Sequence, residues 1–524
     1  MEARAGDGRI VLSSVPEEKI DRAVRLPAVL WDRRLLAWTV PATPASVRNV
    51  ERSFPAIILD GECRRLLDVF NARRDAIRGG RELGPLDLWR HQRQGIAAAG
   101  SEGGALLWHG MSAGKTRTVL ELVKMLGYGR VLVLAPKFVV PAWGEQGARW
   151  GVDVDAIAAG SVREKTRRAT LSTSPVLVVN HAASYREPFR SWAMAQRWDL
   201  IVVDEIQFGK SAGGVFSKFL YRLGKDCPHR LGLSGTPLPH SRMDAYGQMR
   251  FLDPGAFGTS STAFRGRYAE EMALPGMPVK KIIGWRNTED FDRRFWSITH
   301  HVPRECLSLP TENDSSRTFK LSGEARKVYN RLAKDSISEG ITARNSMVKL
   351  LRLQQIANGF LHEDSGIIRT LHGEKAELLA EVLEELDPAE PVVIFARFHE
   401  DLNVIHQVCK KMGRASLELS GRTDDLLQWQ SREGVVLAVQ IQAGGVGIDL
   451  TRACHGIYYS LGYSLGDYLQ SRARISRTNQ LRPCTFMHLL CDCPAERKIY
   501  QAIREKKNAE DEVLKFPGEW FAAA

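Results

Sequence analysis

A run of small residues followed by lysine and threonine has the composition of a loop that binds nucleotide phosphates. The run Gly110-Met111-Ser112-Ala113-Gly114-Lys115-Thr116 follows an apolar segment and precedes a segment with helical spacing, as such a loop requires. Backbone N–H groups would bind phosphate oxygens, Lys115 would add positive charge near the β and γ phosphates, and the Thr116 hydroxyl would reach Mg²⁺. The strict pattern has glycine at position 109, whereas here histidine precedes Gly110. The run predicts a site for ATP and Mg²⁺.

Two adjacent carboxylates, Asp204 and Glu205, end an apolar run further along the chain. Neighbouring residues at the tip of a strand point in different directions. We therefore expect Asp204 to hold Mg²⁺ through water, and Glu205 to orient and deprotonate the attacking water. The simpler interpretation is an acidic strand end that faces solvent, but the phosphate loop upstream favours the catalytic one.

The elements that must position these residues alternate between apolar β-type runs and helical patterns. The runs lie at 105–108, 131–135, 176–180, 200–204 and 230–235, and again at 392–396, 416–420, 435–439, 456–460 and 486–490. This rhythm predicts the α/β class, with two lobes built on parallel sheets that helices cover. After the loop, Val119, Leu122, Val123 and Leu126 share one helical face, and Gly127 ends the predicted helix.

We divide the chain into five predicted parts. They are a small N-terminal accessory module (1–80), a first lobe that binds ATP (81–250), a helical insertion and interlobe linker (251–375), a second lobe (376–505) and a tail (506–524).

Composition favours a polyanionic partner and a cytoplasmic protein. Lys and Arg exceed Asp and Glu by 12, and the pI is near 9.3. No apolar run approaches the roughly 18 residues that cross a bilayer, and the N-terminus lacks the apolar core of a secretory signal. The eight cysteines contain no C-x-x-C, so they indicate neither a zinc site nor a disulfide framework. We expect no membrane association.

The motifs together resemble those of helicase superfamily two, whose cores have two RecA-like lobes. Ser234-Gly235-Thr236-Pro237 resembles its third motif, which implies that Ser234 and Thr236 couple the nucleotide site to lobe movement. Gln92 resembles the glutamine that reads adenine, and AGGVGIDL (443–450) resembles motif five.

Residues 470–480 reproduce the spacing of motif six, Q-x₃-R-x₂-R-x₂-Q. The spacing places Arg474 and Arg477 on one helical face, from which they would reach the γ-phosphate as arginine fingers in cis. The resemblance implies a coupling role for Gln470 and an ATP contact for Gln480. An arginine-rich helix is more often a solvated surface, but four matched positions favour motif six.

The resemblance narrows to the Swi/Snf family of double-stranded DNA translocases over residues 86–505. It is carried by LSGTPLP (233–239), FLDPGAFG (251–258), LSLP (307–310) and LRLQQI (351–356). The sequence departs from the family at two positions: Ile206 stands where the family has Ala or Ser, and Gln207 stands where it has His. We expect Gln207 to keep hydrogen bonds toward Thr236. Ser112 replaces a glycine of the family loop, which narrows the backbone freedom there.

Contacts to DNA can be placed only by position in the motor. Superfamily-two motors touch phosphates at positions that correspond to Pro136, Lys137, His181, Arg397, Gly444 and Gly445. Backbone amides and basic side chains there would bind DNA independently of sequence and sensitively to salt.

The N-terminal stretch with Trp31 and Trp38 is similar to the module that precedes the motor in HARP-type annealing helicases. The two tryptophans could stack on exposed bases or grip branched DNA, although a role in the core of this small domain is the simpler interpretation.

These observations predict a DNA-dependent ATPase that moves along duplex DNA and remodels forks or protein–DNA complexes. We expect a monomer whose partner is double-stranded or branched DNA, from a bacterial cytoplasm or a virus-infected host cell. Two alternatives stay open at this point: a strand-separating DNA or RNA helicase, and an architectural DNA-binding protein with a weakened ATPase.

Overall fold

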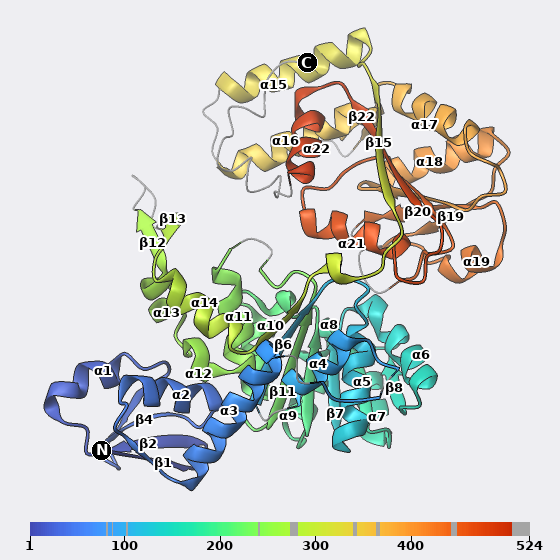
Figure 1. Cartoon of the computed structure of the whole chain (residues 1–524). Coiled ribbons are helices and arrows are strands. Elements are labelled where there is room, and N and C mark those ends of the chain that lie inside the picture. The colour runs from blue at the N-terminus through green and yellow to red at the C-terminus, as the bar shows by residue number, and fades with distance from the viewer. Residues whose placement is uncertain are drawn as a thin grey trace. The chain divides into compact units, whose positions relative to one another are not determined.

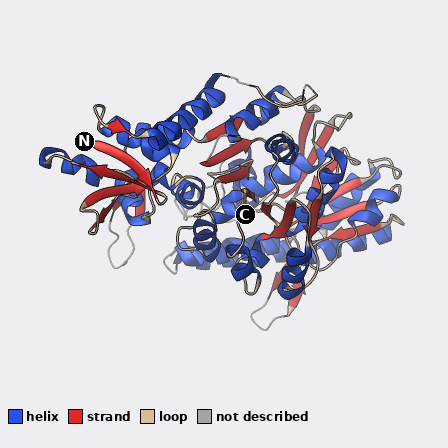
Figure 2. Ribbon diagram, turned by 90° about the horizontal axis from the view of Figure 1, so that it is seen from below, coloured by secondary structure: helices blue, strands red, loops and turns tan. Residues whose placement is uncertain are grey.

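The computed structural model separates into two compact units, Met1–Cys306 and Leu307–Ala524 (Figure 1). The described residues are 1–79, 82–85, 87–100, 103–238, 241–272, 281–338, 343–362, 367–441 and 448–505. Each unit contains one large parallel sheet, and helices flank the strands (Figure 2). Among these residues, no helix is both long and apolar enough to cross a membrane.

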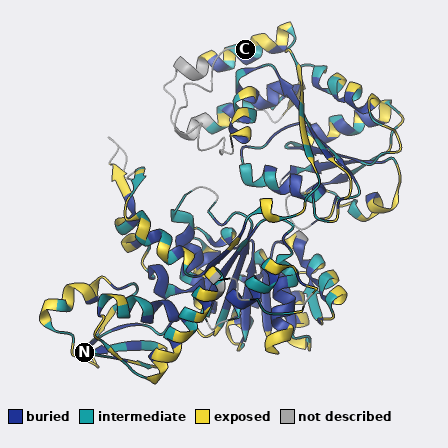
Figure 3. Ribbon diagram, viewed as in Figure 1, coloured by how far each residue is buried: buried dark blue, intermediate teal, exposed yellow. Residues whose placement is uncertain are grey.

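The first unit is built on a seven-stranded sheet in the order β14-β6-β11-β10-β7-β9-β8. All its strand pairs are parallel. Continuous apolar runs such as Val131–Ala135 are buried on both faces, as a sheet covered by helices requires (Figure 3). The strands are β6 (Gly103–His109), β7 (Val131–Ala135), β8 (Val154–Ile157), β9 (Val176–Asn180), β10 (Leu200–Asp204), β11 (His229–Ser234) and β14 (Thr299–Val302).

The helix after the phosphate loop confirms its sequence pattern up to the last turn. Helix α5 covers Lys115–Leu126 and ends at Gly127, whose φ of 61° lies in the left-handed region. Val119, Leu122 and Val123 are buried, whereas Leu126 is 44% exposed because it lies at the end of the helix. The other helices packed on this sheet are α4 (Arg90–Ala99), α6 (Val140–Trp150), α7 (Val162–Leu171), α8 (His181–Ser184), α9 (Phe189–Met194), α10 (Val215–Leu223) and α11 (Met243–Leu252).

The segment predicted as insertion and linker is shared between the two units. Its first part forms α12 (Pro254–Phe257), α13 (Ser261–Tyr268), β12 (Ala269–Met272), β13 (Lys281–Trp285) and α14 (Thr288–Trp296). Aromatic rings of Phe257, Phe264 and Phe291 pack these helices together. Strand β14 then joins the edge of the first sheet beside β6. The division of the chain into five parts stays an interpretation.

The first 80 residues form a separate small sheet with helices on it. Its strands have the order β3-β4-β2-β1-β5. The elements are β1 (Glu2–Gly6), β2 (Arg9–Ser13), α1 (Ile20–Val24), β3 (Leu30–Asp32), β4 (Ala37–Pro41), α2 (Pro44–Ser53), β5 (Ile58–Leu59) and α3 (Gly61–Gly79). Trp31 and Trp38 face each other across β3 and β4, with ring centroids 5.0 Å apart. Trp38 packs on the module's core, while Trp31 is 47% exposed, so the two tryptophans do not share one core role.

Polar contacts fix this module to the first lobe. The Thr43 hydroxyl donates to Asp253 at 2.7 Å, and the Asn49 amide donates to the Gly255 carbonyl at 2.7 Å. The fully buried Arg73 on α3 donates to the Gly104 carbonyl of β6 at 2.8 Å. Burial lowers the pKa of Arg73 to about 10, and nearby Asp253 opposes that change.

The second unit contains a six-stranded parallel sheet in the order β15-β22-β21-β18-β20-β19. Its strands are β15 (Glu312–Phe319), β18 (Val392–Ala396), β19 (Ser416–Leu419), β20 (Val436–Gln440), β21 (His455–Tyr458) and β22 (Cys484–Cys491), and β16 (Phe360–His362) pairs with β17 (Ile368–Thr370). Its helices are α15 (Gly323–Ser338), α16 (Ala343–Ala357), α17 (Glu374–Glu384), α18 (His399–Lys411), α19 (Leu426–Ser431), α21 (Leu465–Ile475) and α22 (Pro494–Arg504).

We predict that Arg73→Met lowers the free energy of unfolding of the N-terminal unit by about 2 kcal/mol, because the buried Gly104 carbonyl loses its charged donor. Urea denaturation of the whole chain measures this change. Arg74→Met is the matched control, since the one ion pair that Arg74 forms within the described part of the chain is with the exposed Asp75, at 3.2 Å. Equal stability of the two variants would contradict the anchoring role of Arg73.

Candidate nucleotide site

Three neighbouring strands carry the candidate site at their carboxyl ends. Strand β11 pairs with β6 on one side and with β10 on the other. The phosphate loop follows β6, Asp204 ends β10 and Ser234 ends β11. Since parallel strands end at the same edge of a sheet, segments distant in sequence meet there, at the edge where α/β proteins bind ligands.

The phosphate loop has the backbone shape of an anion-binding nest. Gly114 caps α5 with a φ of 72°, and Ser112 has a φ of 69°. A Cβ atom at Gly114 would lie 2.3 Å from Nε2 of Gln92, so a side chain there would displace the Gln92 amide as well as strain the backbone. Ser112 adopts the left-handed conformation without the freedom of glycine, and its buried hydroxyl has no hydrogen-bond partner among the described residues.

The displaced glycine at the start of the loop has a structural cause. The His109 side chain is buried, and its Nε2 lies 2.7 Å from Nδ1 of His300 on β14. Burial lowers the pKa of His109 well below its usual value. Gly110 donates its N–H to the Val302 carbonyl at 2.7 Å, and a Cβ atom there would lie 2.8 Å from the backbone nitrogen of Arg304. Glycine is therefore required at 110 because β14 and the residues after it run so close.

Asp204 is a buried carboxylate beside the loop. Burial and, after it, the charge of Glu205 raise its pKa to about 6, and the positive charge of Lys115 opposes the change. Trp143 on α6 donates its indole N–H to Asp204 at 3.1 Å. Lys115 itself donates to the His109 carbonyl at 3.0 Å. The lysine charge favours the ionised form of this buried carboxylate, which is the form that can bind a cation.

A hydrogen-bonded chain connects Glu205 to the third motif. Gln207, in the short helix η3 (Ile206–Gly209), donates to the Glu205 carboxylate at 2.7 Å. Ser234 donates its hydroxyl to Gln207 at 2.8 Å and accepts the Thr236 N–H at 2.9 Å. The expected contact between Gln207 and Thr236 is thus corrected: Ser234 lies between them. Glu205 has a φ of 50°, a left-handed conformation that non-glycine residues keep mainly where function requires it.

The Gln92 side chain is hydrogen-bonded to the phosphate loop and to the residue before α4. Its side-chain oxygen accepts the Trp89 N–H at 3.0 Å, and its amide donates to the Gly114 carbonyl at 3.3 Å. These bonds connect the start of α4 to the phosphate loop. A role of Gln92 in reading adenine stays a prediction.

These residues fit ATP with Mg²⁺. The left-handed positions in the loop orient backbone N–H groups as a phosphate cradle requires, and Lys115 supplies positive charge. Asp204 offers a buried oxygen ligand, and Thr116 lies in the first turn of α5. Oxygen ligands of this kind suit Mg²⁺.

In the second unit, one prediction about the arginines was wrong. Helix α21 ends at Ile475, and Ser476 is extended, so Arg474 lies in the last turn while Arg477 follows the helix. The two therefore do not share a helical face. Arg477 donates to the Ala473 carbonyl at 3.1 Å and lies 3.6 Å from the Asp449 carboxylate. Burial lowers the pKa of Arg477, and Asp449 opposes that change.

The two glutamines of this motif are buried. Gln470 lies on α21 with 8% exposure. The Gln480 amide donates to the Thr451 and Ala453 carbonyls at 2.8 and 2.9 Å, and its oxygen accepts the Arg482 N–H at 3.0 Å. Gln480 thus stabilises its own loop. Its contact with ATP stays a prediction.

The predicted DNA contacts have different surroundings. After β7, Pro136 is buried and Lys137 is exposed. His181 lies 3.1 Å from the Leu134 carbonyl, and burial lowers its pKa to about 4, so its ring is uncharged at pH 7. The ring therefore adds no positive charge at this position, and the contact of His181 with DNA stays a prediction. Gly444 and Gly445 lie outside the described residues.

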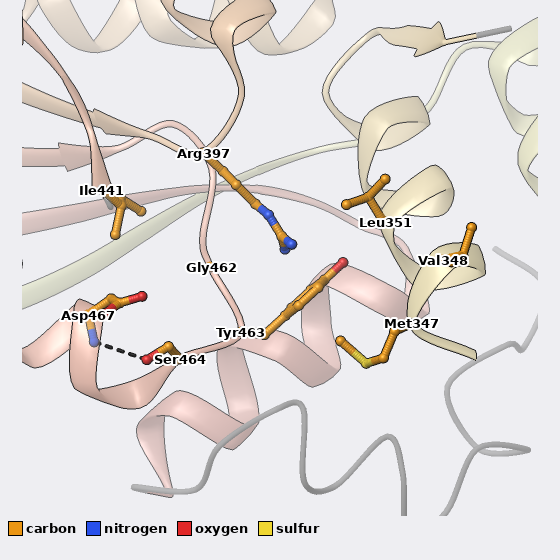
Figure 4. Close-up of a pocket in the computed structure, with 9 residues that line it drawn as sticks. All are labelled: Met347, Val348, Leu351, Arg397, Ile441, Gly462, Tyr463, Ser464 and Asp467. Carbon is orange, nitrogen blue, oxygen red and sulfur yellow. Dashed lines mark hydrogen bonds between the residues drawn. The ribbon is translucent and has the colours of Figure 1, made fainter. Parts of the chain in front are cut away.

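Arg397 lies at a pocket of the second unit (Figure 4). Its guanidinium lies 3.7 Å from the centre of the Tyr463 ring and donates to Gln354 at 2.8 Å. The backbone N–H of Arg397 donates to the Ser460 hydroxyl at 2.8 Å. The side chain is thus held in place by aromatic and polar contacts, and its contact with DNA stays a prediction.

Three residues that shape the site were missed from the sequence. Trp143 binds Asp204, His300 binds His109, and Arg304 excludes a side chain at 110. Only the unusual histidine at 109 gave a signal, because a buried histidine needs a partner. The other two contacts join segments that no local pattern connects.

We predict that Ser112→Gly stabilises the first unit by about 1 kcal/mol, since glycine adopts the left-handed conformation without strain. Thermal unfolding of the whole chain, compared with wild type, measures the shift. Ala113→Gly is the control: Ala113 is buried and has no positive φ, so this change should destabilise. A lower stability of Ser112→Gly would contradict strain at this position.

Comparison with known proteins agrees with this arrangement of motifs. The chain matches the SNF2-related domain over residues 34–365 and the helicase conserved C-terminal domain over residues 374–479. It is 24% identical to human DNA repair and recombination protein RAD54B, covering 76% of this chain and 50% of that protein. It is 24% identical to the putative ATP-dependent helicase/translocase YwqA of Bacillus subtilis, covering 78% and 46%. The chain thus spans about half the length of these relatives.

Two further similarities cover nearly the whole of the matching chain. Putative protein p41 of Acyrthosiphon pisum secondary endosymbiont phage 1 is 25% identical, over 78% of this chain and 94% of that one. A solved structure, the Sulfolobus solfataricus SWI2/SNF2 ATPase core in complex with dsDNA, is 19% identical, with a TM-score of 0.39 over 84% of this chain and 95% of that one. The two family models together cover most of the chain, and it belongs to the SNF2-related family, with a helicase conserved C-terminal domain.

Proposed function

We propose that the chain is a DNA-dependent ATPase that moves along duplex DNA and remodels forks or protein–DNA complexes. The observation that carries this proposal is the meeting of the phosphate loop, Asp204 and the Ser234 end of β11 at one edge of the first sheet. The family supports it, as do the names of the relatives, which include a DNA repair protein and a putative helicase/translocase. The excess of 12 basic residues suits a DNA partner.

In this proposal the first unit binds and positions the nucleotide. Backbone N–H groups of residues 110–114 and the Lys115 ammonium bind the phosphates, while Thr116 and Asp204 hold Mg²⁺. Bound Mg²⁺ would neutralise negative charge on the phosphates. Gln207 orients the Glu205 carboxylate, which accepts a proton from the attacking water. The bond from Ser234 to Gln207 offers a path by which a change at Glu205 reaches the third motif.

The second unit would complete the site when nucleotide binds. Arg474 and Arg477 would supply positive charge to the γ-phosphate, which stabilises the transition state of phosphoryl transfer. Release of Arg477 from Asp449 would accompany that movement, because the same guanidinium serves both contacts. Opening of the nucleotide site after hydrolysis would shift the predicted DNA contacts of the first lobe relative to those of the second. We also propose a monomer that acts in the cytoplasm.

We predict that Glu205→Gln abolishes displacement of a third strand from a DNA triplex. The amide cannot accept the proton, so turnover should fall by about 10²–10⁴ while ATP binding persists. Glu145→Gln is the matched control, because Glu145 is an exposed glutamate on α6. Triplex displacement at the wild-type rate by Glu205→Gln would contradict the assignment.

The same preparation separates the two alternatives. A strand-separating helicase would unwind a forked substrate and show no activity on blunt duplex. An architectural protein with a weakened motor would bind DNA without turning over ATP.

A further inference from the structure

A cleft of about 670 Å³ lies within the first unit, between the N-terminal module and the last elements of the first lobe. Helices α2 and α3 form one side, and α14 with β14 forms the other. Its volume falls within the range of about 300–1,000 Å³ that is typical of ligand sites. The cleft lies apart from the nucleotide loop, since residues 110–116 do not line it.

The lining is strongly basic. It includes one acidic residue, Asp292, which lies 3.4 Å from Arg242, and six arginines: Arg48, Arg52, Arg74, Arg78, Arg293 and Arg294. Arginine binds phosphate groups well because its planar guanidinium donates several parallel hydrogen bonds.

The six arginines differ in how far acidic side chains compensate their charge. Three of them form ion pairs: Arg48 with Glu51, Arg74 with Asp75, and Arg294 with Asp290. By contrast, neither Arg52 nor Arg78 forms an ion pair with any acidic residue in the described ranges, and both are exposed. Arg293 reaches Asp290 only at 4.0 Å, with 45% of its side chain exposed. Two exposed arginines without an ion pair in the described ranges, and a third whose ion pair is long, favour a ligand with several negative charges at this cleft.

The two sides of the cleft are held together by buried contacts. Asn49, which lines the cleft, donates to the Gly255 carbonyl, and Thr43 donates to Asp253. The buried Arg73, next to the lining residue Arg74, anchors α3 on β6. These contacts give the cleft a fixed shape, which lowers the cost of ordering a bound ligand.

An aromatic residue accompanies the arginines. Trp296, at the end of α14, lines the cleft and is 41% exposed. Its ring stacks on Trp108, with centroids 5.5 Å apart and an interplanar angle of 9°, which holds the indole in one orientation. Basic side chains combined with an exposed, oriented aromatic ring are typical of sites that bind unpaired nucleotides.

We propose that this arginine cleft binds unpaired nucleotides of a DNA branch. Arg52, Arg78 and Arg293 contact the phosphates, and a base stacks on Trp296. The volume suits unpaired nucleotides and not a duplex, so the cleft distinguishes forked from blunt DNA. This inference rests on the proposed action on DNA. It specifies which DNA structure the N-terminal module helps to recognise, namely a branch with unpaired nucleotides.

The test compares the double variant Arg52→Glu/Arg78→Glu with Arg22→Glu/Arg25→Glu. The control pair is exposed on the same module, outside the cleft, and changes the charge equally. Fluorescence anisotropy without nucleotide gives the Kd of the whole chain for a fork with single-stranded arms and for a blunt duplex of equal length. We expect the cleft variant to raise the fork Kd about tenfold or more, and to lower the salt slope by about 1.4, or 0.7 for each lost phosphate contact. Its duplex Kd, and both Kd values of the control, should change less than about twofold.

Substitutions at Trp296 test base stacking separately from charge. Trp296→Leu should weaken fork binding about tenfold, whereas Trp296→Phe keeps a ring and should retain most of the affinity. Arg52→Gln/Arg78→Gln replaces the charge-reversal variant if thermal unfolding shows that the latter is unfolded.

Two results would contradict the proposal that the arginine cleft binds unpaired nucleotides. One is an unchanged fork Kd, which would leave an acidic protein as the ligand class; the other is an equal loss on fork and duplex. Duplex-stimulated ATP hydrolysis is measured in parallel and should persist in the cleft variants. Its absence in the wild-type chain would sink the proposed function, while fork binding alone decides the cleft.

Discussion

The burial of Asp204 beside Lys115 is the constraint on which the first unit's site depends. A carboxylate in an apolar sheet is costly unless charge or hydrogen bonds compensate it. Here the lysine charge and the Trp143 indole do so, although burial and Glu205 still raise the pKa of Asp204 to about 6. The lysine can serve this carboxylate only if the loop after β6 turns tightly at the end of the strand beside β11. The site thus needs the strand order as much as the motif residues.

Backbone strain at the same edge follows from that tight turn. Ser112 and Glu205 both adopt left-handed conformations that favour glycine. Contacts nearby support these segments: Gln207 binds the Glu205 side chain, and Gln92 binds the carbonyl of Gly114, two residues after Ser112. Close approach of the chain after β14 leaves room only for glycine at 110. The loop is therefore defined from several sides before any nucleotide binds, which lowers the cost of ordering it around phosphates.

The sequence predicted what local patterns encode. Apolar runs located β7, β9, β10 and β18 to the residue, because strands buried on both faces read as continuous apolar segments. The order of the motifs predicted the family, which the comparisons confirm. The short strand β8 and the edge strand β14 were not predicted, since each has only four residues and β14 contains two histidines. Arg477 was misplaced because the helical spacing continues past Ser476 while the helix does not.

Contacts between distant segments could not be predicted. Thr43 binds Asp253, and Asn49 binds Gly255, across more than 200 residues, and nothing local marks either pair. The arginine cleft depends on these contacts, so it has no signature in the sequence beyond its charge. The similarity of the stretch with Trp31 and Trp38 to HARP-type annealing helicases stays a prediction, as do the roles of the individual site residues.

Steady-state ATP hydrolysis with and without blunt duplex DNA, in wild type and Lys115→Ala, tests the central claim most directly. The claim is that the loop, Asp204 and Glu205 form one nucleotide site that DNA controls. It predicts that duplex DNA raises the wild-type rate several-fold, and that Lys115→Ala removes both the basal and the stimulated rate. A rate that ignores duplex DNA and survives Lys115→Ala would contradict it.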